Sequence, residues 1–147
     1  MNSEPGRVMA LDLGARRIGV ALSDPTRRLA SPLTTLRAEP RDLVLRRIAQ
    51  LVHDHEVTEL VVGLPLTLRG EIGPQAKVVQ EFIEVLRGVV SAPIHTIDER
   101  LTSAEAERRM IELGLKPEQR RARIDEVAAS IILQDFLDQW HARRAQG

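Results

Sequence analysis

An uninterrupted apolar run, Leu60 to Leu64, is the feature of this 147-residue sequence that most restricts its fold. Short continuous runs of this kind are typical of strands buried on both faces of a parallel sheet. Residues 41–56 before the run and about 75–87 after it carry apolar side chains at helical spacing. Because strand and helix alternate here, the sequence predicts an α/β domain with helices on both faces of its sheet.

Further predicted elements lie on either side of this pattern. The first third of the chain reads as three consecutive strands, Val8 to Asp12, Ile18 to Leu22 and Leu29 to Leu36. Pro32 cannot donate a ladder hydrogen bond, which places the third strand at a sheet edge. The last third predicts a strand from Ile94 to Ile97, a helix over 102–113 that starts at the capping box Thr102-Ser103-Ala104-Glu105, and a helix over about 125–142.

The order of these elements predicts a five-stranded mixed sheet. Strands one to three form a meander and strands four and five run parallel to strand one, which gives the spatial order 3-2-1-4-5. This succession resembles the ribonuclease H-like fold. The length is that of about one domain, so we expect a single domain over residues 1–147. The tails, about 1–6 and 143–147, are expected to be flexible.

Composition excludes several classes of site. The chain has no cysteine, which leaves oxygen ligands or histidine for any metal ion. The 21 basic and 21 acidic residues cancel, so net charge does not indicate a nucleic-acid binder, although the basic stretch 116–123 lies next to Asp125. The few aromatic residues argue against an exposed base-stacking platform. Without a membrane-length apolar run or a signal-like start, the protein is expected to be cytoplasmic, with no membrane partner.

Acidic residues stand at three unusual places. Asp12 ends an apolar strand, Asp98-Glu99 closes another, and Asp125 lies in the polar turn that opens the last predicted helix. Taken alone, Asp12 also fits a turn residue and Asp125 a helix N-cap. Together, however, the three acidic elements are what a magnesium site for phosphodiester hydrolysis needs. Within the 98–99 pair only one side chain can face the site, and we favour Glu99 because its longer side chain reaches further.

Four motif-like blocks stand in order along the chain. They are Leu11-Asp12-Leu13-Gly14 with Arg17-Ile18-Gly19-Val20-Ala21, Val62-Gly63-Leu64-Pro65-Leu66 with Gly70, Asp98-Glu99-Arg100-Leu101-Thr102-Ser103, and Ile124-Asp125-Glu126-Val127-Ala128-Ala129. In this order they resemble the motifs of the RuvX/YqgF family, whose members are described as Holliday junction resolvases or as nucleases that mature the 5′ end of pre-16S ribosomal RNA. The resemblance extends from about Val8 to Trp140, and one departure is Glu126, at a position where Ser is more usual.

The resemblance implies a metal-dependent nuclease. Asp12, Glu99 and Asp125 would be its catalytic residues and would ligate one or two Mg²⁺ or Mn²⁺ ions. In related resolvases the second acid usually comes from strand four, but here that strand ends in Gly63-Leu64-Pro65, so Glu99 must reach in from strand five. Asp98 would support the site by holding Arg100 or neighbouring amides. The residues expected to grip flanking phosphates are Arg17, Arg100, Arg121 and Arg123.

Other functions remain open at this stage. Actin-like ATPases and sugar kinases share the opening Asp-x-Gly motif, but they need two such domains, for which 147 residues are too few. A non-catalytic nucleic-acid-binding module of the same fold is a second alternative. The substrate is either structured RNA or branched DNA, with RNA maturation ranked first on the family resemblance. Cutting a junction symmetrically favours a homodimer, to which Phe136 and Trp140 could contribute, whereas trimming an RNA end needs only a monomer.

Overall fold

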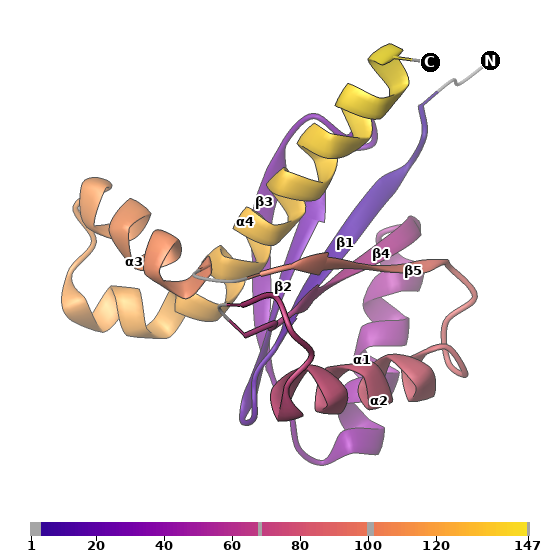
Figure 1. Ribbon diagram of the computed structural model, residues 1–147, viewed down its shortest axis with the longest axis horizontal. Coiled ribbons are helices and arrows are strands. Elements are labelled where there is room, and N and C mark those ends of the chain that lie inside the picture. Colours follow the sequence, from indigo (N-terminus) through magenta and orange to yellow (C-terminus); the bar gives the residue numbers. More distant parts are fainter. Residues whose placement is uncertain (1–3, 68, 100–101, 147) are drawn as a thin grey trace.

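The computed structural model describes residues 4–67, 69–99 and 102–146 and contains one five-stranded sheet (Figure 1). The strands lie in the predicted order β3-β2-β1-β4-β5, with β1, β2 and β3 antiparallel and with β4 and β5 parallel to β1. The elements are β1 (Arg7–Leu13), β2 (Arg17–Ser23), β3 (Ala30–Arg37), α1 (Arg41–Asp54), β4 (Val57–Leu64), α2 (Pro74–Leu86), β5 (Ile94–Asp98), α3 (Thr102–Glu112) and α4 (Pro117–Gln146).

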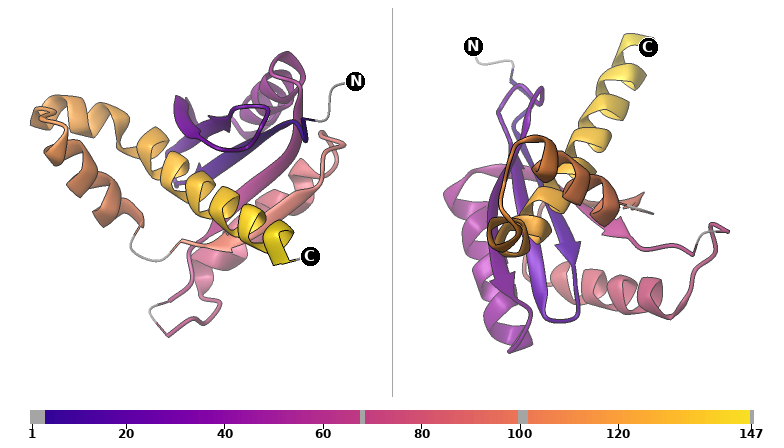
Figure 2. Two further views of the ribbon diagram at one scale, coloured as in Figure 1. Left: turned by 90° about the horizontal axis from the view of Figure 1, so that it is seen from above. Right: turned by 90° about the vertical axis from the view of Figure 1, so that its left-hand side faces the viewer.

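Helices cover both faces of the sheet, as the sequence predicts. Successive side chains of β1 point alternately into the two cores that these helices form. Met9 and Leu11 point into the core shared with α1 and α2, whereas Val8 and Ala10 point into the core shared with α4. Figure 2 shows α4 crossing one face while α1 and α2 lie on the other. Among the described residues, no helix combines the length and the apolar character that a membrane span requires.

Strand β3 forms an edge of the sheet, where Pro32 was expected. Pro32 lies opposite Ala21 and Thr34 lies opposite Val20, so β3 has one extra residue at this point. An edge position tolerates both the missing N–H of proline and the irregular register.

The last helix is longer than the sequence analysis predicted. It begins at Pro117 rather than near 125 and runs for 30 residues, so the basic stretch 116–123 is helical from Pro117 onward. Pro117 suits the first turn of a helix, and neither Gly nor Pro follows it before residue 147. Asp125 therefore lies about two turns inside α4 and is not its N-cap. The early turns of α4 pack on α3 through Ala106, Ala128 and Ile131, and the two helices form the arm that projects from the sheet in Figure 1.

The C-terminal half of α4 is fixed to the sheet through Arg27, a fully buried cation. Its guanidinium donates to the backbone oxygen of Gly6 at 2.8 Å and lies 3.4 Å from the Glu59 carboxylate. It also lies 4.9 Å from the centre of the Trp140 ring. Phe136 is buried and stacks on His95, so it belongs to the core of one chain and is not available to the dimer face suggested by the sequence.

Candidate active site

Asp12 lies close to the end of the central strand β1, half-buried, on the face covered by α4. Its partner on β2 is Gly19. A Cβ atom added to Gly19 would lie only 1.9 Å from the backbone oxygen of Asp125. The missing side chain therefore lets the backbone of α4 rest directly on β2, and this close approach brings Asp125 to the end of the strand that carries Asp12.

A second glycine opens the other side of Asp12. Gly63 of β4 pairs with Ile97 of β5, and a Cβ atom on Gly63 would lie 2.6 Å from a carboxylate oxygen of Glu99. The side chain of Glu99 thus occupies the space that any other residue at position 63 would fill. It reaches across β4 from the end of β5, as the sequence analysis expected.

The carboxyl groups of Asp12 and Glu99 are hydrogen-bonded to each other. Burial, the charge of Asp12, this hydrogen bond and the charge of Asp98 together raise the pKa of Glu99 to about 9. Burial also raises the pKa of Asp12, while the hydrogen bond from Glu99 opposes that rise and the charge of Asp125 adds to it. At neutral pH Glu99 is therefore the protonated partner, and it donates to the carboxylate of Asp12.

Asp125 faces the same space but has a partner of its own. Its Oδ2 accepts a hydrogen bond of 2.8 Å from Nε of Arg17, at the start of β2. In this arrangement, no three carboxylate or imidazole groups among the described residues are close enough together to bind one ion. Gathering all three acids around a cation would require Asp125 to exchange Arg17 for that cation.

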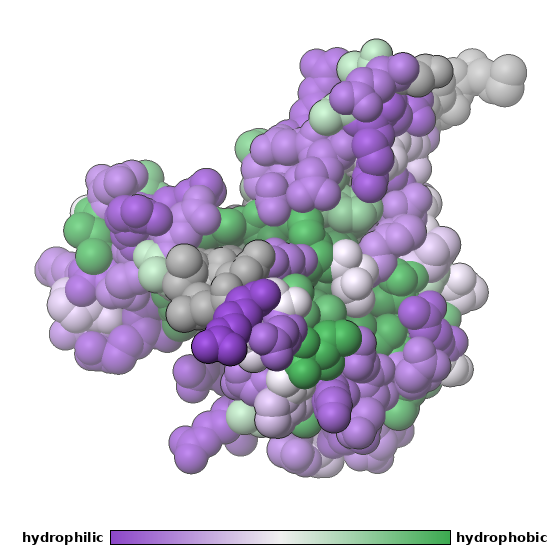
Figure 3. Space-filling model, in the orientation of Figure 1, coloured by the Kyte–Doolittle hydropathy of each residue, from purple (hydrophilic) through white to green (hydrophobic). Residues whose placement is uncertain are grey.

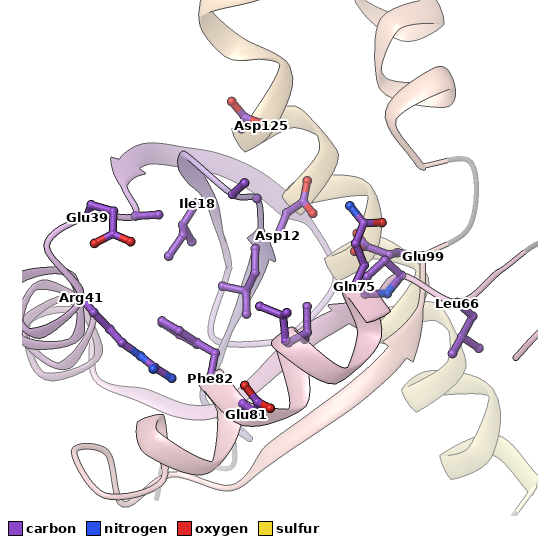
Figure 4. Close-up of a pocket in the computed structure, with 17 residues that line it drawn as sticks. Asp12, Ile18, Glu39, Arg41, Leu66, Gln75, Glu81, Phe82, Glu99 and Asp125 are labelled. Atoms are coloured by element: carbon purple, nitrogen blue, oxygen red, sulfur yellow. The ribbon is translucent and has the colours of Figure 1, made fainter. Parts of the chain in front are cut away.

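The three acids line one end of a cavity of about 680 Å³ at the carboxyl ends of β1 and β4 (Figure 4). In α/β sheets, the crevice at the carboxyl ends of the strands is the usual place for a ligand. The remaining walls come from the β1–β2 hairpin, the β3–α1 connection with the first residue of α1, the segment after β4, and α2. Sequence reasoning found the acids but not the rest of the cavity, which includes Gln75, Phe82 and Arg41. A glycine inside each of two apolar strands was the available signal, because such glycines often mark a close approach of another group.

The other expected site residues have different surroundings. Asp98 is exposed, and its charge helps to raise the pKa of Glu99. Arg121 and Arg123 are exposed on α4, and Nε of Arg123 lies 3.1 Å from the carboxylate of Glu126. Arg100 lies outside the described residues. Of the three arginines that the structure describes, Arg17 is the one in contact with a candidate catalytic acid.

Comparisons with known proteins agree with one another. The family model described as RuvX, Holliday junction resolvase, matches residues 6–139. A protein of Roseiflexus sp. (strain RS-1), named "Putative pre-16S rRNA nuclease", is 70% identical over 138 residues, which cover 94% of this chain and 98% of that protein. A protein of the same name from Moorella thermoacetica is 46% identical and covers 90% of this chain and 94% of its own.

Solved structures resemble the fold at low sequence identity. Thermus thermophilus RuvC in complex with a Holliday junction substrate has a TM-score of 0.57 at 14% identity and covers 92% of this chain and 96% of its own. The Fowlpox virus resolvase in complex with Holliday junction DNA has a TM-score of 0.54 at 11% identity and covers 91% and 98%. These likenesses confirm the predicted ribonuclease H-like fold class.

Proposed function

The chain belongs to the RuvX family, and we propose that it is a nuclease that hydrolyses phosphodiester bonds of structured nucleic acid with the help of Mg²⁺ or Mn²⁺. One observation carries the proposal. Two carboxyl groups, Asp12 and Glu99, are in hydrogen-bond contact at the end of the central strands and share a cavity with a third, Asp125. A stable fold has no need to gather three acids there, whereas a cation site does.

The residues present suit a hard divalent cation. All three candidate ligands, Asp12, Glu99 and Asp125, offer carboxylate oxygen, which is the donor that Mg²⁺ and Mn²⁺ prefer. Asp12 and Glu99 keep a proton between them because two buried negative charges repel each other. A cation would supply the compensating charge instead. Bound there, it would act as a Lewis acid that generates a nucleophile from water at neutral pH and stabilises the charge of the leaving oxygen.

The chain's own residues would position the substrate. Arg17 pairs with Asp125 in this structure, and on release from that pair its guanidinium would be placed to bind a phosphate next to the cut. Arg121 and Arg123, exposed on the arm, would contact phosphates further along the strand. Arg100 is proposed for the same role from the sequence. The negative charge of Asp98 would stabilise the proton that Asp12 and Glu99 share. In place of that proton, the same charge would attract the cation.

The 5′ end of pre-16S ribosomal RNA is the substrate that we place first. The proposal follows the name of the Roseiflexus relative, which aligns over nearly its whole length at 70% identity. Cleavage of a four-way DNA junction is the second candidate, from the family description. An RNA end can be trimmed by one active site, so a monomer suffices, whereas symmetric cutting of a junction calls for a two-fold dimer. Processing of ribosomal RNA would place the protein in the cytoplasm.

A cleavage assay with both substrates tests the proposal. Wild-type protein, Asp12→Asn and the matched control Asp42→Asn would be given a pre-16S RNA leader or a four-way junction, each with Mg²⁺, Mn²⁺ or EDTA. Asp42 is 80% exposed on α1 and lies outside the cavity. We expect cleavage by wild type and by Asp42→Asn with either metal and none with EDTA. Asp12→Asn should lose cleavage and keep most of its nucleic-acid binding.

Two outcomes would contradict this assignment. Full metal-dependent cleavage by Asp12→Asn would remove Asp12 from the catalytic site. Tight binding of both substrates by wild-type protein, without turnover under any metal condition, would favour the non-catalytic binding module instead.

A further inference from the structure

The cavity continues well beyond the three acids. Figure 4 shows Asp12, Glu99 and Asp125 near one end, with Glu39, Arg41, Glu81 and Phe82 at the other. Its volume of about 680 Å³ lies within the range of roughly 300–1,000 Å³ that small-molecule sites occupy. A site that only held a cation and one phosphate would not need this additional length.

The charges at the far end restrict what can bind there. Glu39 and Glu81 contribute carboxylates, and Arg41 contributes the one guanidinium among the described cavity residues. In the described part of the chain, no ion pair joins Arg41 to an acid; its guanidinium carbon lies 5.6 Å from the centre of the Phe82 ring. A second phosphate would meet two carboxylates and one guanidinium, so this end disfavours the backbone of a nucleic acid. A neutral nucleobase has no such repulsion, and its amino and ring N–H groups can donate to carboxylates.

Part of the cavity wall is apolar. Ala15 and Ile18 line it from the β1–β2 hairpin, and Val78 and Val79 line it from α2. Figure 3 shows hydrophobic residues gathered on the molecular surface close to the loop between β4 and α2. Ile72 lies in this loop, outside the cavity lining, and is 52% exposed. An aromatic base bound between hairpin and helix would bury apolar surface on both sides while its sugar stays near the acids.

From this arrangement we propose that the cavity is a base-binding site for one unpaired nucleotide next to the scissile phosphate. The proposal rests on the proposed nuclease function and adds a specificity site to it. Arg41 is the residue that contacts the base, since guanidinium groups stack on unpaired bases. Phe82 positions Arg41, because its ring lies against the guanidinium. A base cannot enter the cavity while it is stacked and paired in a duplex, so cleavage requires a single-stranded or splayed nucleotide at this position.

An abasic scan combined with cavity variants tests this site. The substrates are RNA oligonucleotides that each lack one base, at successive positions around the mapped cut. Their binding would be measured with Asp12→Asn, and their single-turnover cleavage with protein that keeps Asp12. If protein that keeps Asp12 does not cleave, the scan covers the whole bound oligonucleotide. In the protein with an intact cavity, we expect one position next to the cut at which base removal weakens binding roughly 5- to 100-fold.

The cavity variants make the test specific. With Arg41→Gln or Phe82→Leu, removing that same base should change binding less than about twofold, because the contact is already lost. Phe82→Leu keeps an apolar side chain at this half-buried position, so the variant should remain folded. Thermal unfolding would verify that it does. Val85→Ala on the same helix and Arg47→Gln on α1 are controls outside the cavity, and both should keep the full penalty.

The outcomes separate this site from the nuclease activity itself. If wild-type protein cleaves RNA but no abasic position is penalised, or if the penalty persists in Arg41→Gln and Phe82→Leu, the base-binding site is wrong while the nuclease stands. If no cleavage occurs but one base still couples to Arg41 and Phe82 in binding, the base-binding site stands and the nuclease is wrong.

Discussion

The proton shared by Asp12 and Glu99 predicts an unusual dependence of stability on pH in the metal-free protein. The pKa of Glu99 is about 9 in the folded chain and 4.5 when it is unperturbed. Between these values the folded state holds one proton more than the unfolded state. The free energy of unfolding must therefore fall as pH rises; the contribution is complete below about 4.5 and lost as pH passes through about 9.

The magnitude follows from linkage. One proton of difference corresponds to a slope of about 1.4 kcal/mol per pH unit, so Glu99 alone would lower stability by up to about 4 kcal/mol between roughly pH 5.5 and 8.5. The raised pKa of Asp12 acts in the same direction. A change of this size is a large part of the roughly 5–15 kcal/mol that stabilise a typical domain.

Urea unfolding in EDTA, repeated at several pH values, measures this slope. Glu99→Gln removes the main titrating group while its amide can still donate to Asp12, so its profile should be clearly flatter over the same range, with Asp12 left as the smaller contributor. Glu84→Gln, an exposed substitution on α2, should keep the wild-type slope. A wild-type profile that is flat or that rises with pH would refute the reasoning, as would equal slopes for wild type and Glu99→Gln.

Three further substitutions test the packing around the site. Gly19→Ala should destabilise the protein by about 1–3 kcal/mol in urea unfolding, because its Cβ would overlap the backbone oxygen of Asp125; an unchanged midpoint would contradict the close approach of α4. Gly63→Ala should lower the rate of metal-dependent cleavage more than it lowers stability, because its Cβ displaces the carboxylate of Glu99; a wild-type rate would argue against that placement. Arg27→Ala should cost about 3–5 kcal/mol, since it removes a buried cation together with its ion pair to Glu59 and its hydrogen bond to the Gly6 backbone, and a loss below 1 kcal/mol in the same assay would count against these contacts.

The fold was predictable because its signals are local and repeated. Continuous apolar residues in Leu60 to Leu64 indicated a doubly buried strand, and Pro32 indicated an edge; both strands occupy those positions. Alternation along β1 puts Asp12 on the same face as Val8 and Ala10, which α4 covers. These inferences depend only on residues that are neighbours in sequence, where strand periodicity is strict.

The start of α4 was not predictable in the same way. Asp125 follows a polar stretch and resembles an N-cap, but helix-forming residues from Glu118 onward and packing of α3 against Ala128 continue the helix back to Pro117. Ala129 packs against the sheet, whereas its neighbour Ala128 faces α3. Which side of a helix meets which neighbour depends on tertiary contacts that the local pattern does not encode.

The candidate site shows why its acids are widely separated in sequence. Asp12 pairs with Gly19 on β2, and on its other side Gly63 follows Val62, the β4 partner of Leu11, so these two neighbouring strands supply no second ligand. Each empty position is filled from another element: the backbone of α4 packs over Gly19, and the carboxyl group of Glu99 packs over Gly63. The three acids therefore meet only when β5 has joined the sheet and α4 has packed on it. A chain that lacks either contact would carry Asp12 without one of its partners, so metal binding and cleavage should require both α4 and β5 to be in place.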